Sequence, residues 1–221
     1  PEVHLISNEV NVGFSKANNQ GVDIAVGEYV LILNPDTVVG ENTFLELLNF
    51  SKEIKDLGAV GVQLVDGTGA YLPESKRGIP TLRASFNRFL GKDKNKGTYY
   101  ANDLLQDEVG AIDVLVGAFM FLKTDVYKEV GGFDEDYFMY GEDIDLSYSL
   151  LKYGYQNYYL GTSKTIHFKG ESTRKDTKYL KHFHGAMEIF YKKHFTSNFF
   201  QDTALKIFIK IWYLLKYLRL A

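Results

Sequence analysis

The sequence contains no cysteine. This absence excludes a disulfide scaffold, catalysis by a thiol and metal binding by thiolates, and it leaves the cellular compartment open. A large excess of charge is also absent, because the formal net charge of the 221 residues is −3. The bulk charge therefore gives no reason to expect a nucleic acid as a partner. No signal peptide is visible, and the sequence starts at Pro1 without an initiator methionine, so we expect a processed or trimmed start.

Apolar and aromatic residues are plentiful. Hydrophobic residues make up 45% of the chain and charged residues 24%, which is the usual balance of a globular protein. The length allows one sizeable domain with its own core. There are 16 tyrosines and 16 phenylalanines. Tyrosine suits sugar binding because it offers a flat face and a hydroxyl, but core packing explains most of these residues equally well.

The order of apolar segments predicts strands that alternate with helices. Such alternation indicates an α/β fold with a central, mixed but mostly parallel sheet flanked by helices. We assign residues 1–198 to this domain and 199–221 to a C-terminal basic amphipathic helix. Strands are expected at 3–7, 28–33, 59–65, 109–122 with an interruption at Gly117, and 155–160. Helices are expected at 17–25, from 42, from 124, and at 141–153, 178–195 and 199–220. Asn42 is expected to cap the second helix, which would bury Phe44, Leu45, Leu47 and Leu48.

The apolar run at 28–33 ends at Asn34, Pro35 and Asp36. In open α/β sheets, ligands bind beyond the carboxyl ends of the strands. A carboxylate at Asp36 can hold a hard cation such as Mg²⁺ or Mn²⁺, and the cation can bind a diphosphate. The competing interpretation is an ordinary turn at the end of a strand, because Asn, Pro and Asp all favour turns.

A loop rich in Gly and Asn, at residues 11–21, leads from the first expected strand into a helix. Glycine permits close approach of the backbone, and the N–H groups at a helix start favour anions. The loop matches neither a phosphate loop nor a dinucleotide fingerprint. Its asparagines could hydrogen-bond a nucleoside or simply cap the helix.

The run at residues 131–145 contains six carboxylates and four aromatic side chains. Glu142, Asp143 and Asp145 stand where a helix is expected to begin, and the helix dipole alone favours carboxylates there. A solvated acidic surface would rarely carry so many aromatic residues, so a lined cleft fits better. Crowded carboxylates have perturbed proton affinities, which suits a general base.

His167 follows the strand expected at 155–160. A lone histidine after a strand is more often structural than a ligand. An imidazole and a carboxylate can nevertheless share a metal ion with oxygens of a substrate.

Four blocks in this order resemble glycosyltransferase family 2, and in particular its rhamnosyltransferase-like members with a GT-A fold. The resemblance covers about residues 3–173. The blocks are Asn-x-Gly-Phe with Asn-Asn-x-Gly, then Gly-Glu-Tyr-Val-Leu-Ile-Leu-Asn-Pro-Asp, then Gly-Ala-Phe-Met with Gly-Gly-Phe-Asp-Glu and Tyr-Gly-Glu-Asp-Ile-Asp-Leu, and finally His-x-x-Gly-x-Ser.

The resemblance implies roles for individual residues. Asp143 matches the catalytic base of the family, and Glu142 would orient it or meet the acceptor. Asp36 matches the last acidic position of the metal-binding Asp-x-Asp motif, with Asn34 in place of the first Asp. His167 would complete the metal or diphosphate site. Further matches are Gly117 and Ala118 beneath the donor sugar, and Asn11, Gly13 and Asn19 in the loop on the nucleotide side.

The same resemblance implies an inverting hexosyltransferase, with rhamnose as one candidate sugar. It would move the sugar from a nucleotide-diphosphate sugar to a hydroxyl of a glycan or lipid-linked saccharide. A divalent metal, Mn²⁺ or Mg²⁺, would assist in this step of bacterial cell-surface polysaccharide synthesis. The first strands of the family, which carry a residue that contacts the base, are missing from the sequence. The alternatives are a non-catalytic glycan-binding homologue and another metal–nucleotide transferase.

The segment from Ala204 to Leu220 is apolar, with basic residues at intervals. This density of charge argues against a membrane-spanning helix. Lys206, Lys210 and Lys216 fall on one side of a helical wheel, which suits a helix in the membrane interface. We therefore expect a cytoplasmic protein, peripheral on the inner face of the cell membrane. In the competing interpretation the helix docks on the domain or on a partner subunit of a homodimer.

Overall fold

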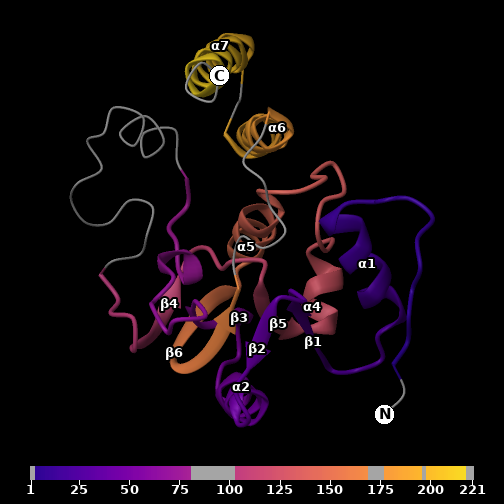
Figure 1. Cartoon of the computed structure of the whole chain (residues 1–221), viewed down its shortest axis with the longest axis vertical. Helices are drawn as coiled ribbons and strands as arrows, with labels where there is room; N and C mark the ends of the chain where they lie inside the picture. Colours follow the sequence, from indigo (N-terminus) through magenta and orange to yellow (C-terminus); the bar gives the residue numbers. More distant parts are fainter. Residues whose placement is uncertain (1–2, 81–102, 169–176, 196–197, 218–221) are drawn as a thin grey trace.

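A computed structural model of the chain describes residues 3–80, 103–168, 177–195 and 198–217. The expected mixed α/β architecture is confirmed: one sheet is covered by helices on both faces (Figure 1). The strands are β1 (Tyr29–Leu33), β2 (Thr37–Val39), β3 (Leu57–Val65), β4 (Val109–Ile112), β5 (Phe119–Lys123) and β6 (Gln156–His167). The helices are α1 (Phe14–Ile24), α2 (Thr43–Lys52), α4 (Thr124–Glu129), α5 (Glu142–Lys152), α6 (Thr177–His194) and α7 (Phe199–Tyr217), with a short 3-10 turn at Pro73–Ser75.

The sheet has the strand order β1-β5-β3-β6-β2, and β4 pairs with the first half of β6. The prediction of a mostly parallel sheet is wrong, because β3 and β6 form the one parallel pair among the five described pairings. Strand β5 enters between β1 and β3 and runs against both. Short β2 and β4 both run against β6. Alternation of strands and helices along a sequence cannot reveal such insertions.

Four local predictions differ from the structure. The segment 3–7 is not a strand within the described chain, and its Val3 and Leu5 are more than four-fifths exposed. Strand β6 is longer than expected and continues to His167. Asn42 precedes α2 without a side-chain capping bond. Of the side chains expected inside this helix, Leu47 is buried, Leu48 is half-buried, and Phe44 and Leu45 are exposed.

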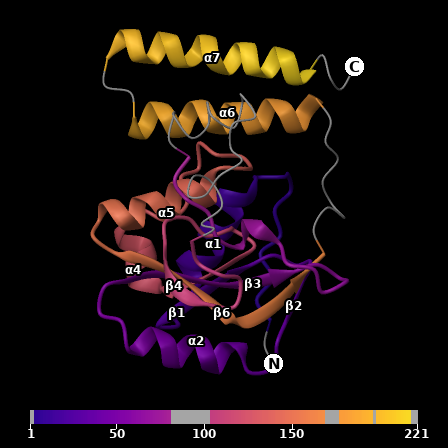
Figure 2. The ribbon, with the colours of Figure 1, turned by 90° about the vertical axis from the view of Figure 1, so that its left-hand side faces the viewer.

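The helices form layers on the sheet. Helix α2 covers one face, while α5 covers the other and α6 and α7 are stacked beyond α5 (Figure 2). Two apolar clusters fill the faces of the sheet. One contains Leu146 of α5 and Val22 of α1, and the other contains Leu47 of α2.

Helix α7 does not stand alone. Its Leu205 and Ile209 share a third cluster with Ala186 and Phe190 of α6. This packing supports the interpretation in which the last helix docks on the domain, and the boundary at residue 198 stays a prediction. In the described parts of the chain, no helix is long and apolar enough to cross a bilayer.

Candidate active site

The site is built where β1 ends and β5 begins. These strands are antiparallel neighbours, and the backbone N–H of Asn34 donates to the carbonyl oxygen of Ala118 at 3.0 Å. Gly117 precedes Ala118 and touches α5: a β-carbon on Gly117 would lie 3.3 Å from the β-carbon of Asp143. The structure therefore brings together Asn34, Gly117, Ala118 and Asp143, which sequence reasoning placed in one site.

Asp143 lies in the first turn of α5 and is 8% exposed. Its Oδ2 accepts hydrogen bonds from the backbone N–H of Gly117 at 3.0 Å and from Nη2 of Arg77 at 2.5 Å. Its Oδ1 accepts one from the backbone N–H of Ile144 at 2.8 Å. The carboxylate is thus held by three donors at the edge of the sheet.

Arg77 is the residue of this site that sequence reasoning missed. It is buried, and its Nη2 also donates to the carbonyl oxygen of Leu115 at 2.8 Å. Its backbone forms an antiparallel bridge with Val114. Arg77 stands in a polar segment without a clear period, so no pattern in the sequence links it to a carboxylate 66 positions away.

Glu142 is also buried, and its Oε2 has no hydrogen-bond partner among the described residues. Burial raises the pKa of Glu142 to about 8, and the charge of Asp143 adds to this rise, while the charge of Arg77 opposes it. Two adjacent buried carboxyl groups, one of them paired with an arginine, form an arrangement suited to proton transfer.

Asp36 and His167 meet on the next pair of strands. The register pairs Thr37 of β2 with His167 of β6, and Oδ1 of Asp36 lies 3.3 Å from Nε2 of His167. Oδ1 of Asp36 and Nδ1 of His167 are buried and without hydrogen-bond partners in the described chain. Because Asp36 follows Asn34 by two residues, this pair lies at the same edge of the sheet as Asp143.

These two side chains fit a divalent cation. Neighbouring ligand atoms around an octahedral metal ion lie about 3 Å apart, close to the separation of Asp36 Oδ1 and His167 Nε2. Nowhere in the described chain do three or more Asp, Glu, His or Cys side chains gather as a metal site. A cation here would therefore take its other ligands from water and from substrate oxygens, as Mg²⁺ commonly does.

The loop before α1 has a structural role in this chain. Gly13 has a φ of 86°, and a β-carbon there would lie 2.5 Å from the carbonyl oxygen of Phe138. Only glycine permits this approach, which lets Phe14 donate its backbone N–H to the same oxygen at 2.9 Å. Asn11 is exposed and accepts a hydrogen bond from the backbone N–H of Gly13. The predicted nucleotide contacts of Asn11 and Gly13 stay predictions.

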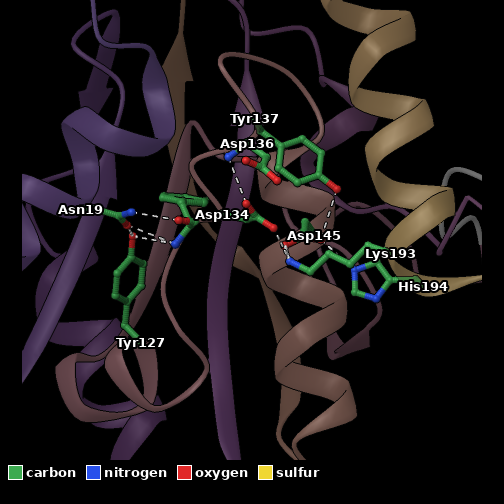
Figure 3. A network of polar contacts seen from close by, with 9 residues as sticks. Asn19, Tyr127, Asp134, Asp136, Tyr137, Asp145, Lys193 and His194 are labelled. Carbon is green, nitrogen blue, oxygen red and sulfur yellow. Dashed lines mark hydrogen bonds and ion pairs between the residues drawn. The ribbon is translucent and has the colours of Figure 1, made fainter.

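Asn19 joins α1 to the acidic loop between α4 and α5, which contains Phe133 and Glu135 (Figure 3). Its Nδ2 donates to the carbonyl oxygen of Phe133 and to Oε1 of Glu135. Its Oδ1 accepts from the hydroxyl of Tyr127 and from the backbone N–H of Phe133. The amide is fully engaged within the protein, so this geometry gives no support to its predicted role as a nucleotide ligand, which stays untested.

Asp145, one turn into α5, anchors α6 (Figure 3). Its Oδ2 accepts from Nζ of Lys193 at 2.9 Å, and its Oδ1 lies 2.7 Å from Nε2 of His194 and 3.2 Å from the hydroxyl of Tyr137. Lys193 also reaches Oδ2 of Asp134 at 2.6 Å. Burial would raise the pKa of Asp145, but the hydrogen bonds from His194 and Lys193 outweigh it and lower the pKa. We call these five residues the α5–α6 clamp.

The fold defines the class of protein first. The chain superimposes on the crystal structure of GalNAc-T7 with UDP, GalNAc and Mn²⁺ with a TM-score of 0.55, over 83% of this chain and 37% of that chain. At 15% identity this similarity shows the fold alone, which is the GT-A fold of glycosyltransferases.

The family follows from the sequence match. The model of glycosyltransferase-like family 2 matches residues 1–182, and the chain belongs to this family. It is 28% identical over 190 residues to N-acetylglucosaminyl-diphospho-decaprenol L-rhamnosyltransferase of Mycobacterium tuberculosis, covering 80% of this chain and 62% of that protein. It is 27% identical over 169 residues to rhamnosyltransferase WbbL of Escherichia coli, covering 76% and 61%. The chain thus spans about three-fifths of the length of these relatives.

Proposed function

We propose that this chain carries the catalytic site of an inverting glycosyltransferase. In this proposal a sugar moves from a nucleotide-diphosphate sugar to a hydroxyl of a glycan or lipid-linked saccharide during cell-surface polysaccharide synthesis. The observation that carries the proposal is the junction of β1, β5 and α5, where Asp143 is held beside the strand end that leads to Asp36. A base and a diphosphate site at one sheet edge are what such a transfer needs.

Asp143 acts as the base. The acceptor hydroxyl gives its proton to the Asp143 carboxylate while its oxygen forms a bond to the anomeric carbon of the donor sugar. The bond from that carbon to the diphosphate oxygen breaks, and its electron pair leaves with the diphosphate. Because the acceptor attacks opposite the leaving group, one such step inverts the anomeric centre.

Asp36 and His167 would hold the divalent cation, which supplies positive charge for the leaving diphosphate when it is bound. Oδ1 of Asp36 is buried and, although Nε2 of His167 lies 3.3 Å away, it accepts no hydrogen bond among the described residues. This supports the assignment, since a buried oxygen without a hydrogen bond is costly unless a ligand satisfies it. Gly117 and Ala118 line the same edge and would lie beneath the donor sugar.

Glu142 would meet the acceptor. It is a buried neutral acid at pH 7, and its Oε2 is unpartnered among the described residues. A protonated carboxyl can donate a hydrogen bond to a sugar hydroxyl and accept another, which would orient the acceptor toward Asp143.

The relatives suggest the substrate class. Two of them carry rhamnosyltransferase in their names, and one name specifies a lipid-linked diphosphate acceptor. These names support a hexosyl donor such as a nucleotide-linked rhamnose and a lipid-linked acceptor for this protein.

The outer face of α7 would hold the protein on the inner face of the cell membrane. Ile207, Ile211 and Leu214 lie on one side of the helix and are each more than half exposed, and Lys210 beside them is exposed. Apolar side chains next to a basic residue suit the interface of an anionic membrane. Lys206 is half-buried, and the side chain of Lys216 lies outside the described residues. Of the three lysines predicted to face the membrane, Lys210 is therefore the one that the structure describes as exposed. The competing occupant of this face is a second copy of the chain.

The test uses the full-length protein with a panel of nucleotide sugars and lipid-linked acceptors, and mass spectrometry detects the glycosylated product. Transfer by the unmodified protein should fall by about a thousandfold in Asp143→Asn, because a general base contributes on the order of 10²–10⁴. Donor affinity should stay within a few-fold, since the base acts in the transition state. Near-normal transfer by Asp143→Asn would disprove the assignment. Glycan binding without turnover of any donor would instead favour a non-catalytic homologue.

A further inference from the structure

Arg77 is buried against the proposed base, and neither the sequence motifs nor the comparisons assign it a role. We propose that Arg77 is the positioning residue of Asp143: it occupies Oδ2, leaves Oδ1 as the atom that takes the acceptor proton, and places a positive charge against the carboxylate. This inference rests on the proposed function, in which Asp143 is the base.

The first argument is the occupancy of the two carboxylate oxygens. Each oxygen of an ionised carboxylate can accept about two hydrogen bonds. Oδ2 accepts from Arg77 and from Gly117, so its capacity is used. Oδ1 accepts one bond, from the backbone of Ile144, and keeps a free lone pair. The acceptor proton therefore goes to Oδ1.

The second argument is that both donors to Oδ2 belong to one fixed unit. The backbone of Arg77 is bonded to Val114 in both directions, at 3.0 and 2.9 Å, and its Nη2 is tied to the carbonyl oxygen of Leu115. Gly117, the other donor, follows in the same segment. A planar guanidinium held in this way loses little freedom when it binds the carboxylate. The segment 114–117 and Arg77 thus set the rotation of the Asp143 side chain.

The third argument is charge. Glu142 and Asp143 are adjacent and buried, and two such carboxylates with no cation would compete for one proton. The guanidinium of Arg77 forms an ion pair with Oδ2 of Asp143 at 2.5 Å, so the one cation of this group lies directly against the carboxylate proposed as the base. After transfer, the new proton is on Oδ1 and the carboxyl is neutral, while Arg77 can keep its hydrogen bond to Oδ2 throughout the step.

The experiment measures sugar transfer by the full-length protein from pH 5 to pH 9, with separate kcat and KM for the donor. In Arg77→Gln, kcat should fall by about 10–100-fold because the base is misplaced, while the donor KM changes by less than about threefold. The rising limb of the pH profile should also move to higher pH, since the carboxylate pair loses its cation. Lys55→Gln, which removes an exposed cation, is the control and should change none of these quantities.

Arg77→Lys keeps the charge and guards against a folding defect in Arg77→Gln. A lysine offers a point charge without the guanidinium fork. We expect its pH profile to resemble that of the unmodified protein, with kcat reduced by a smaller factor than in Arg77→Gln. Guanidinium ion added to a folded Arg77→Gln protein should restore part of kcat.

The outcomes separate the two proposals. If Asp143→Asn abolishes transfer but both Arg77 variants, folded by circular dichroism, keep the normal kcat and pH profile, the role of Arg77 is disproved and the proposed function stands. If kcat falls in Arg77→Gln with an unchanged pH profile and no rescue by guanidinium, Arg77 is merely structural and the inference is overturned. If Asp143→Asn transfers sugar normally, the proposed function fails and the inference fails with it.

Discussion

Two groups of carboxylates differ in how their oxygens are satisfied, and the first turn of α5 carries members of both. Asp145, in the α5–α6 clamp, has both oxygens engaged by lysine, histidine and tyrosine side chains. Glu142, in the same turn, and Asp36 at the strand end each keep a buried oxygen that accepts no hydrogen bond in the described chain. A buried oxygen without a partner costs stability, so its presence marks a place where a ligand is expected. The clamp joins α6 to α5, whereas the sheet edge is where we propose that the chemistry takes place.

The comparison predicts its largest effect on stability at the clamp. Asp145→Ala removes the carboxylate from the buried His194, whereas the more exposed Lys193 keeps Asp134. Removing one member of a buried pair typically costs about 3 kcal/mol or more. The free energy of unfolding, measured with urea, should fall by about this amount. Asp136→Ala, in the same acidic run but exposed, should change it by less than about 0.5 kcal/mol. Equal effects of the two changes would remove the distinction between the groups.

A change at Glu142 should alter the free energy of unfolding in the opposite direction from a change at Asp145. Its pKa is about 8 in the folded protein and near 4.5 for an exposed glutamate. Between these values the unfolded chain has lost the proton that the folded protein retains, so the free energy of unfolding falls as pH rises from about 4.5 to 8. Glu142→Gln removes this dependence and should stabilise the protein at pH 8 by about 1–3 kcal/mol relative to its effect at pH 4.5.

Thermal unfolding of Glu142→Gln at pH 4.5 and pH 8 measures this difference. Glu53→Gln, a change at an exposed position, is the matched control and should leave the pH dependence unaltered. An identical pH dependence in Glu142→Gln and in the unmodified chain would show that Glu142 is ionised in the fold at neutral pH.

A change at Asp36 should affect binding of the donor with its metal ion. Calorimetry with the full-length protein, donor and Mn²⁺ should show that Asp36→Ala weakens metal-dependent donor binding by about tenfold, or 1.4 kcal/mol. Donor binding without metal should be unaffected. Glu41→Ala, at an exposed position nearby in the sequence, should bind normally. Metal-independent donor affinity in the unmodified protein would exclude the proposed cation site.

The sequence predicted several elements of the fold but did not distinguish the carboxylates of the clamp from those of the sheet edge. The apolar pattern predicted α1, α5, α6 and β1 near their observed positions. Burial of one face of a helix or strand makes apolar residues recur at a regular spacing, which can be read from the sequence. The resemblance to the family implied that His167 lies near Asp36, and the two side chains are 3.3 Å apart. The acidic run, however, contains both kinds of carboxylate, and nothing in its residue types separates Asp145 from Asp143. That distinction depends on partners 48 and 66 positions away, Lys193 and Arg77.

The smallest expected effect is on membrane binding by α7. This helix also has two kinds of apolar side chain, some buried and some exposed. Leu205 and Ile209 are packed against α6, whereas Ile207 and Ile211 are exposed. Replacing Lys210 by Gln should weaken co-sedimentation with anionic vesicles by about 1 kcal/mol, with less effect at high salt, because a basic residue near such a surface contributes about that much.

The apolar part of this prediction has its own test. Ile207→Ser with Ile211→Ser should weaken binding to anionic and neutral vesicles alike, whereas Lys55→Gln should change neither. Removal of α7 would be a poorer test, since it also removes the buried Leu205 and Ile209. If the serine variant sediments normally but loses dimers in analytical ultracentrifugation, the outer face of α7 belongs to a second copy of the chain.

Strand β1 lies at one end of the strand order and, within the described chain, pairs on one side only, with β5. Its sequence, Tyr-Val-Leu-Ile-Leu, contains neither a charge nor a proline. Those are the features by which natural proteins prevent open strands from recruiting other chains. The strand that leads to Asp36 therefore also governs colloidal behaviour: at high concentration the isolated chain should aggregate edge to edge unless another strand covers β1.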